Sequence, residues 1–262
     1  MNPLLFCPNS AFEGGVINIL HAHLFNSPIQ SLPGAFPQFN QLNNIYAQMK
    51  RLLNCPGLYN LYHADGNCLN KFFTGKVYHG HDIPIWINDP IRSDYRLMIV
   101  SDSPRRSDNE MYDSVNTIPQ LSISSPFGTH STYWRRGRNG IVPHVIQAII
   151  EKAKTNCNLD LSVYITDAYK LCDGKNCVSL NIIYKDILFE EIKHFRPHYI
   201  IALGNGAFKL LQQTINKNTC ISKTKITKVK HPSKRNGQSA AKFQKDVIGI
   251  LKPELCKEIT KE

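Results

Sequence analysis

The sequence predicts an α/β fold: a three-layer α/β/α arrangement in which a central four-stranded parallel sheet lies between helices. From about residue 96 onward, short apolar runs typical of buried strands alternate with longer segments of helical periodicity. Each apolar run ends in polar or glycine-containing residues, as strands do where they lead into loops. Strands that alternate with helices in this way need a parallel sheet covered on both faces. We therefore place an α/β domain at residues 93–262 and a mainly helical N-terminal extension, packed on it, at residues 1–92.

The first half of the α/β domain holds two pairs of strand and helix. A strand is predicted at residues 96–102, which read RLMIVSD, and a helix at residues 142–154, after a basic turn that contains GRNG. The second strand, at residues 162–168, is built on a Val-Tyr-Ile run typical of a buried strand. Residues 181–195 then have the apolar spacing of a helix.

The second half repeats this order. A strand is predicted at residues 198–204, which read HYIIALG, and a helix at residues 206–215. The last strand covers residues 225–231, and the last helix starts near Ser239. The eight elements alternate as strand and helix throughout, which is the order of a doubly wound α/β domain.

The first ninety or so residues have a different character, because they are rich in Asn, Pro, Gly and His. Residues 39–54 form one convincing amphipathic segment. Five apolar residues share its face: Leu42, Ile45, Met49, Leu52 and Leu53. No internal repeat is visible. We therefore expect a helical extension rather than an independent domain.

The charge of the chain indicates a polyanionic partner. Its 262 residues include 31 Lys and Arg against 20 Asp and Glu, a formal net charge of +11. Nucleic acid is the commonest polyanion, although charge alone leaves ribosomal-type or membrane-surface binding open. The apolar stretches are too short to span a membrane, and the N-terminus lacks the features of a signal peptide. We expect a monomer in the cytoplasm that binds DNA and no membrane.

Functional residues of doubly wound folds gather where strands end, so the strand ends are the places to search. Five segments follow one another in a recognisable order: MIVSDSP, SPFG, YITDAYK, RPHYIIALGNGAFKLL and VKHPSKRNG. They resemble, in turn, motifs of the uracil-DNA glycosylase superfamily: its G-E-A-P-G loop, R-P-F-V-G segment, Y-I-T-N-x-x-K segment, central A-L-G strand and H-P-S loop. The resemblance covers roughly residues 96–250. It is nearest in style to the thermostable bacterial and archaeal branch.

The resemblance assigns two catalytic residues. Asp102 takes the place of the carboxylate or polar group that orients water and stabilises the positive charge that develops on the sugar. His231 would donate a hydrogen bond to the departing base, a role suited to a neutral imidazole. Taken alone, Asp102 is better explained as a turn cap and His231 as a structural histidine, and the motifs in order reverse this preference. Ser103 stands where another branch keeps its aspartate, and Arg105 follows the proline where the family has glycine or tyrosine.

Further residues are assigned to the base and to DNA. Phe127 would stack on an extruded base, and a core phenylalanine is the alternative. The loop after His231 suits phosphate contact or insertion into the gap left by a flipped nucleotide. The residues assigned to DNA contact are Ser233, Lys234, Arg235, Asn236, Arg135, Arg136 and Lys170.

Asp167 departs from the family in a way that predicts the substrate. In the uracil enzymes this position is an asparagine, which donates to O4 of uracil and accepts from its N3 hydrogen. An ionised aspartate only accepts, so it suits the exocyclic amine of cytosine, and a protonated aspartate would also satisfy cytosine N3. Alternatively, Asp167 caps a turn or pairs with Lys170 and contacts no base.

We therefore predict a DNA glycosylase that excises a modified cytosine and leaves an abasic site. Removal of plain cytosine would destroy the host genome, and Arg105 replaces the tyrosine that blocks 5-substituents in some uracil enzymes. Glycosylases of this superfamily that excise glucosylated 5-hydroxymethylcytosine from phage DNA imply a role in antiviral defence. Uracil is the alternative substrate, and a non-catalytic DNA-binding module is the alternative class.

Cofactors are not expected. The eight cysteines contain no C-x-x-C pair, and Cys172 with Cys177 does not match the four-cysteine iron-sulfur pattern of some relatives. His79, His81 and Asp82 lie close together in sequence and could bind a metal, but a structural turn is the better explanation because a third committed ligand is not evident. The LGNGAF segment lacks the full dinucleotide-binding pattern. No lysine occupies a motif position for Schiff-base chemistry, so strand cleavage is not predicted.

Overall fold

The structure is a computed structural model. It describes residues 10–20, 22–23, 80–82, 84–102, 123–124, 141–172, 181–216, 221, 224–231 and 240–259. The predicted helix at residues 39–54 lies outside these ranges. None of the helices in the described part of the chain is both long and apolar enough to cross a membrane.

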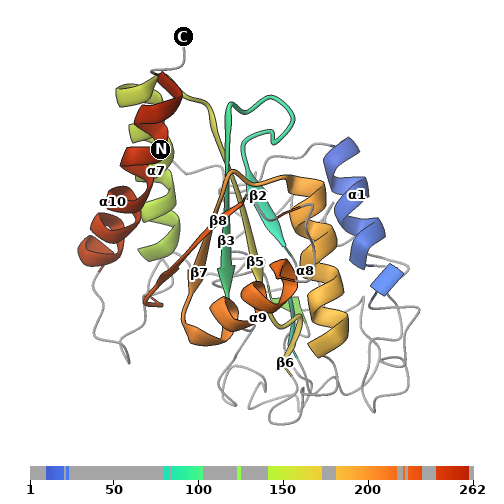
Figure 1. Ribbon diagram of the computed structural model, residues 1–262. Coiled ribbons are helices and arrows are strands. Elements are labelled where there is room, and N and C mark those ends of the chain that lie inside the picture. The colour runs from blue at the N-terminus through green and yellow to red at the C-terminus, as the bar shows by residue number, and fades with distance from the viewer. Residues whose placement is uncertain are drawn as a thin grey trace, which may run out of the picture.

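The fold is α/β, as predicted, with a parallel sheet between two layers of helices (Figure 1). The parallel strands are β3 (Tyr95–Ser101), β5 (Leu161–Asp167), β7 (Tyr199–Leu203) and β8 (Lys225–Val229). The helices α7 (Ile141–Cys157) and α10 (Ala240–Ile259) contact each other on one side of the sheet. On the other side, α8 (Asn181–Phe195) contacts both α9 (Asn205–Ile215) and α1 (Ser10–Leu20).

The main sheet has one strand more than the four predicted. Its order is β2-β5-β3-β7-β8, and β2 (Ile85–Ile87) pairs antiparallel with β5 at the edge. Residues 85–87 belong to the segment that we had assigned to the helical extension. A three-residue strand carries too little period-2 pattern to be predicted, and its position depends on a partner that is far away in sequence.

A second, small sheet lies next to the end of β5. It is formed by β4 (Ile123–Ser124), β1 (Gly80–Asp82) and β6 (Leu171–Cys172), in that order. Because β6 follows closely after β5, the pairing of β1 with β6 brings Asp82 to the turn between them.

The described parts of the extension pack into the same apolar core as the main sheet. Phe12 of α1 makes an edge-on contact with Trp86 of β2, with the ring centroids 5.1 Å apart, and stacks on His194 of α8 at 4.5 Å. The ring nitrogen Nε2 of His194 also lies 2.9 Å from the carbonyl oxygen of Phe12. Trp86 is fully buried, and buried aromatic side chains contribute strongly to folding. Both α1 and β2 are therefore integral to the core.

Candidate active site

The strand order places a topological switch point between the ends of β3 and β7. The connection after β3 leads to β5 on one side, whereas the connection after β7 leads to β8 on the other. Open α/β sheets bind their ligands at such a switch point, beyond the carboxyl ends of the strands. Asp102 follows β3 directly, and Gly204 and Gly206 follow β7. The predicted catalytic aspartate therefore stands at this switch point.

Asp102 packs against the first turn of α9. Its carbonyl oxygen accepts a hydrogen bond from the Tyr169 N–H at 2.9 Å, which fixes the backbone at the end of β3. Its carboxyl group lies so close to Gly206 that a Cβ at that position would overlap Oδ1 and come within 2.9 Å of Cγ. Gly204 has a φ of 96°, a conformation that other residues rarely adopt. The N-terminus of a helix favours a nearby negative charge, and Asp102 lies at such an N-terminus.

Asp167 ends β5 in register with Ser101 of β3, and it is only 2% exposed. Its N–H donates to Oδ2 of Asp82 at 3.0 Å. Burial raises the pKa of Asp167 well above its usual range, and the negative charges of Asp82 and Asp102 raise it further. Lys170 and a hydrogen bond with the Ser101 side chain act in the opposite direction but are outweighed. Asp167 therefore favours the protonated, neutral acid.

His231 lies two residues beyond β8 and is partly buried. Burial lowers its pKa, and the negative charge of Asp102 opposes this change without reversing it. The imidazole is therefore neutral at neutral pH. Asp102 interacts electrostatically with both Asp167 and His231, so the structure brings these three predicted residues together.

Lys170 does not contact DNA, which corrects the sequence-based assignment. The side chain is 0% exposed, and its Nζ lies 2.9 Å from Oδ2 of Asp82 and 2.9 Å from both carboxylate oxygens of Glu191. It also donates to the hydroxyl oxygen of Thr166. Burial alone would lower the pKa of Lys170, but Asp82 and Glu191 outweigh it and raise the pKa. The lysine is a buried structural cation that a phosphate cannot reach.

The buried network around Lys170 contains residues that sequence reasoning missed. Asp82 accepts from the Thr166 hydroxyl at 2.7 Å, and Glu191 accepts from the Tyr164 hydroxyl at 3.1 Å. Nothing in the sequence marks Glu191 as a site residue, because it lies on a helix with ordinary amphipathic spacing. Asp82 had been considered as a metal ligand, but its carboxylate is committed to this network. Within the described residues, no group of three or more His, Cys, Asp or Glu side chains could hold a metal ion.

The remaining predicted site residues lie outside the described ranges, and their roles stay predictions. They are Ser103, Arg105, Phe127, Arg135, Arg136, Ser233, Lys234, Arg235 and Asn236. The same holds for Cys177, which was considered with Cys172 as a cluster ligand.

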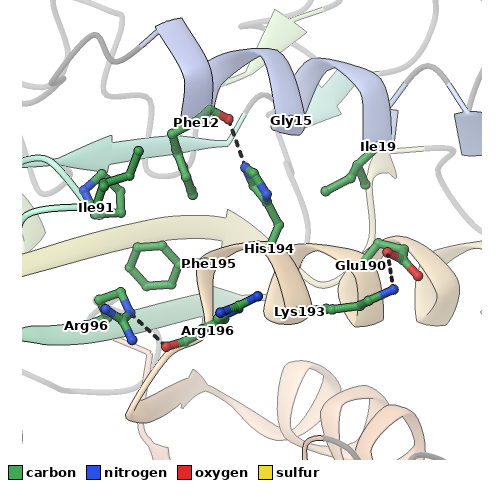
Figure 2. A pocket seen from close by; sticks show the side chains of 11 residues that line it. Phe12, Gly15, Ile19, Ile91, Arg96, Glu190, Lys193, His194, Phe195 and Arg196 are labelled. Atoms are coloured by element: carbon green, nitrogen blue, oxygen red, sulfur yellow. Dashed lines mark hydrogen bonds and ion pairs between the residues drawn. The ribbon is translucent and has the colours of Figure 1, made fainter.

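A separate surface pocket of about 470 Å³ is lined by residues of α1, the end of α8 and the start of β3 (Figure 2). Arg96 at the start of β3 donates from Nε to the carbonyl oxygen of Arg196 at 2.9 Å on its wall. Asp102 stands at the other end of the same strand. This pocket therefore lies away from the switch point at which Asp102 stands.

Comparison with known proteins identifies a family. A family model described as the uracil DNA glycosylase superfamily matches residues 90–252, more than half of the chain. No curated protein gives a significant match.

Proposed function

The chain belongs to the uracil DNA glycosylase superfamily, whose members are DNA glycosylases, and from this premise we propose that it excises a modified cytosine from DNA. The observation that carries the proposal is the buried acid Asp167 at the carboxyl end of β5, close to Asp102. The products would be a free base and an abasic site. The proposed setting is defence against phages whose DNA carries modified cytosine.

Asp102 would stabilise the sugar while the bond to the base breaks. When the bond between C1′ and the base nitrogen N1 breaks, the electron pair leaves with the base and positive charge develops on the sugar. A carboxylate held against the start of α9 can stabilise that charge and orient the attacking water. The water oxygen then bonds to C1′, and the water proton is released. This assignment gives Asp102 a function that a simple turn cap would lack.

His231 would donate a hydrogen bond to the departing base. Because burial lowers its pKa, the side chain is a neutral imidazole with one N–H to donate. Negative charge collects on the carbonyl oxygen of the base as the bond breaks, and a preorganised donor stabilises it in the transition state. A neutral donor also avoids cancelling the negative charge of Asp102, with which it interacts.

Asp167 would read the base. A neutral carboxyl group has one donor and one acceptor, so its hydroxyl can face N3 of cytosine while its carbonyl oxygen accepts from the exocyclic amine. Cytosine N3 is a more basic acceptor than uracil O4, which strengthens this hydrogen bond. An aspartate at this position therefore favours cytosine-type bases over uracil.

Uracil remains the second candidate substrate, because the neutral acid can also match its edge. In that pose the Asp167 hydroxyl donates to O4 and the carbonyl oxygen accepts from the N3 hydrogen. The same burial that favours cytosine pairing thus permits uracil pairing when the proton sits on the other oxygen. The two substrates differ in whether the acid proton is needed at N3.

The proposal that the enzyme does not cut the strand is supported by the environment of Lys170. A Schiff-base nucleophile must be a neutral amine with access to C1′. Lys170 is fully buried between two carboxylates, which raise its pKa and keep it charged. We therefore expect intact abasic strands as the products.

Base release from matched duplexes tests the proposed function. Each duplex would carry uracil, unmodified cytosine, 5-hydroxymethylcytosine or glucosylated 5-hydroxymethylcytosine at one position, and free bases would be identified by mass spectrometry. We expect release of a modified cytosine and intact strands until the abasic sites are cleaved chemically. Release of uracil alone would select the second candidate. No release from any duplex would support a DNA-binding module without chemistry.

A further inference from the structure

Asp82 reaches the site from outside the segment that matches the family model. It belongs to β1, and the match begins at residue 90. The backbone N–H of Asp82 donates to the carbonyl oxygen of Lys170 at 2.8 Å, and its side-chain Oδ2 accepts from the N–H of Asp167 at 3.0 Å. Asp82 thus fixes both ends of the turn that carries Asp167. A residue of the N-terminal region therefore controls the position of the base-reading side chain.

The charges around this turn do not balance. Three buried carboxyl groups, those of Asp82, Asp167 and Glu191, lie near one buried cation, Lys170. The ammonium group makes its ion pairs with Asp82 and Glu191, both at 2.9 Å. Oδ1 of Asp82 is buried and has no hydrogen-bond partner among the described residues. An excess of buried negative charge is costly, and the usual response is for a carboxyl group to keep its proton.

Among the described residues, the charged groups that act on Asp167 come from several elements. Asp82 of β1 and Asp102 after β3 oppose its ionisation, and Lys170 after β5 favours it. Glu191 of α8 forms an ion pair with Lys170, so it acts on Asp167 through that lysine. His231 after β8 is neutral and interacts with Asp102. After burial itself, Asp82 has the largest effect on the pKa of Asp167.

We propose that Asp82 is a positioning residue that keeps a proton on Asp167, and that Asp167 passes this proton to N3 of the departing cytosine-type base. The inference rests on the proposed function. It adds two roles to the reaction. Asp167 acts as a general acid, and Asp82, which lies outside the residues that match the family model, keeps that acid protonated.

The step balances as follows. The C1′–N1 bond breaks and its electron pair goes to the base, while the proton moves from the Asp167 hydroxyl to N3, so the base leaves neutral. Water adds its oxygen to C1′ and releases one proton, and Asp167, now a carboxylate, is reprotonated from solvent. A departing cytosine anion gains from this proton, whereas uracil already carries hydrogen at N3. General acids of this kind accelerate reactions by about 10²- to 10⁴-fold.

The test compares Asp82→Asn with Glu191→Gln. Asparagine keeps an oxygen that can accept from Asp167 and Thr166, but it removes the negative charge. The Glu191→Gln variant neutralises the other carboxylate that pairs with Lys170. Glu191 is not among the groups that shift the pKa of Asp167 directly, so this variant is the matched control. Two measurements are made on each folded protein: single-turnover release of modified cytosine and uracil as a function of pH, and titration of Asp167 by NMR of ¹³C-labelled aspartate carboxyl groups.

We expect Asp82→Asn to move the NMR titration of Asp167 to lower pH and to move the upper limb of the modified-cytosine profile by the same amount. A movement of one pH unit lowers the rate about tenfold on that limb. Uracil release should change less, and Glu191→Gln should leave the Asp167 titration closer to wild type.

Two results would overturn the inference. One is an Asp167 titration that is the same in Asp82→Asn and wild type. The other is a modified-cytosine profile that does not follow the titration. If the wild type releases no base, the proposed function fails, and the NMR titration still decides whether Asp82 holds the proton on Asp167.

Discussion

The carboxyl group of Asp102 occupies the space that a side chain on Gly206 would need. A Cβ on Gly206 would overlap Oδ1 of Asp102 and lie 2.9 Å from its Cγ. The end of β3 and the start of α9 approach each other this closely because residue 206 has no side chain. The position of the proposed catalytic carboxylate therefore depends on a glycine that takes no part in the chemistry.

Gly206→Ala should displace Asp102 and slow base release. Displacements of about 1 Å in an active site cost about 10²-fold in rate, and we expect a loss of that order with DNA binding retained. Gly249→Ala on α10 is the control, because a Cβ there meets nothing within 4 Å. Single-turnover kinetics and thermal unfolding of both variants check this. Equal rates for Gly206→Ala and wild type would mean that Asp102 need not lie where we place it.

Asp167→Asn should change the preferred base from modified cytosine to uracil. Asparagine offers a donor and an acceptor but no transferable proton, so release of modified cytosine should fall by about 10²-fold or more while uracil release is kept or gained. The control is Asp160→Asn, because Asp160 is exposed and pairs with Lys154 at the surface. Competition between the two substrates in one reaction gives the ratio directly. An unchanged ratio would remove Asp167 from base reading.

Lys170→Met should destabilise the fold without changing how DNA binding depends on salt. Removing one partner of a buried ion pair costs about 3 to 5 kcal/mol, because it leaves carboxylates without a counter-charge. Lys154→Met is the control, because its pair with Asp160 is exposed and such pairs contribute about 0 to 1 kcal/mol. Urea unfolding gives the free energies. If the two variants lost equal stability, the network would not support the fold, and a smaller salt slope for Lys170→Met would restore its role in DNA contact.

The buried acids should make stability depend on pH. Burial raises the pKa of Asp82, Asp167 and Glu191 in the folded protein. An acid with a raised folded pKa stabilises the fold fully below its unfolded pKa of about 4, and this contribution is lost as the pH rises through the folded pKa.

We therefore expect the free energy of unfolding to contain a component that falls as the pH rises above about 4. Asp167→Asn should remove the contribution of Asp167 to this component, so the free energy of unfolding should depend less steeply on pH. Urea unfolding of wild type and Asp167→Asn between about pH 5 and pH 8 isolates that contribution, because the contribution of His231 is common to both proteins. Parallel curves would show that Asp167 titrates alike in the folded and unfolded chains.

Local pattern was enough to predict the parallel sheet and its helices. The helix predicted at residues 181–195 is α8 with the same bounds, because its apolar spacing and its flanking strands agree. β2 was missed because its three residues form a strand only through pairing with β5. Elements stabilised by distant partners leave little trace in their own sequence.

The predictions for the site show the same contrast between local sequence and distant contacts. The resemblance of the motifs assigned Asp102, Asp167 and His231, and the structure places each at or just after the end of a parallel strand, on one edge of the sheet, while their roles stay predictions. The assignment of Lys170 was wrong because a lysine in a motif says nothing about whether it is buried. Asp82 could not be linked to Asp167, since the two lie 85 positions apart and meet only in the folded chain.

The most direct test of the central claim compares wild type with Asp102→Asn on a duplex that contains one glucosylated 5-hydroxymethylcytosine, measuring base release and DNA affinity on the same samples. We expect release by wild type, a loss of about 10²- to 10³-fold in Asp102→Asn, and equal affinity of the two proteins for DNA. Equal release by the two proteins would contradict this expectation, because the carboxylate at the end of β3 would then play no part in breaking the bond.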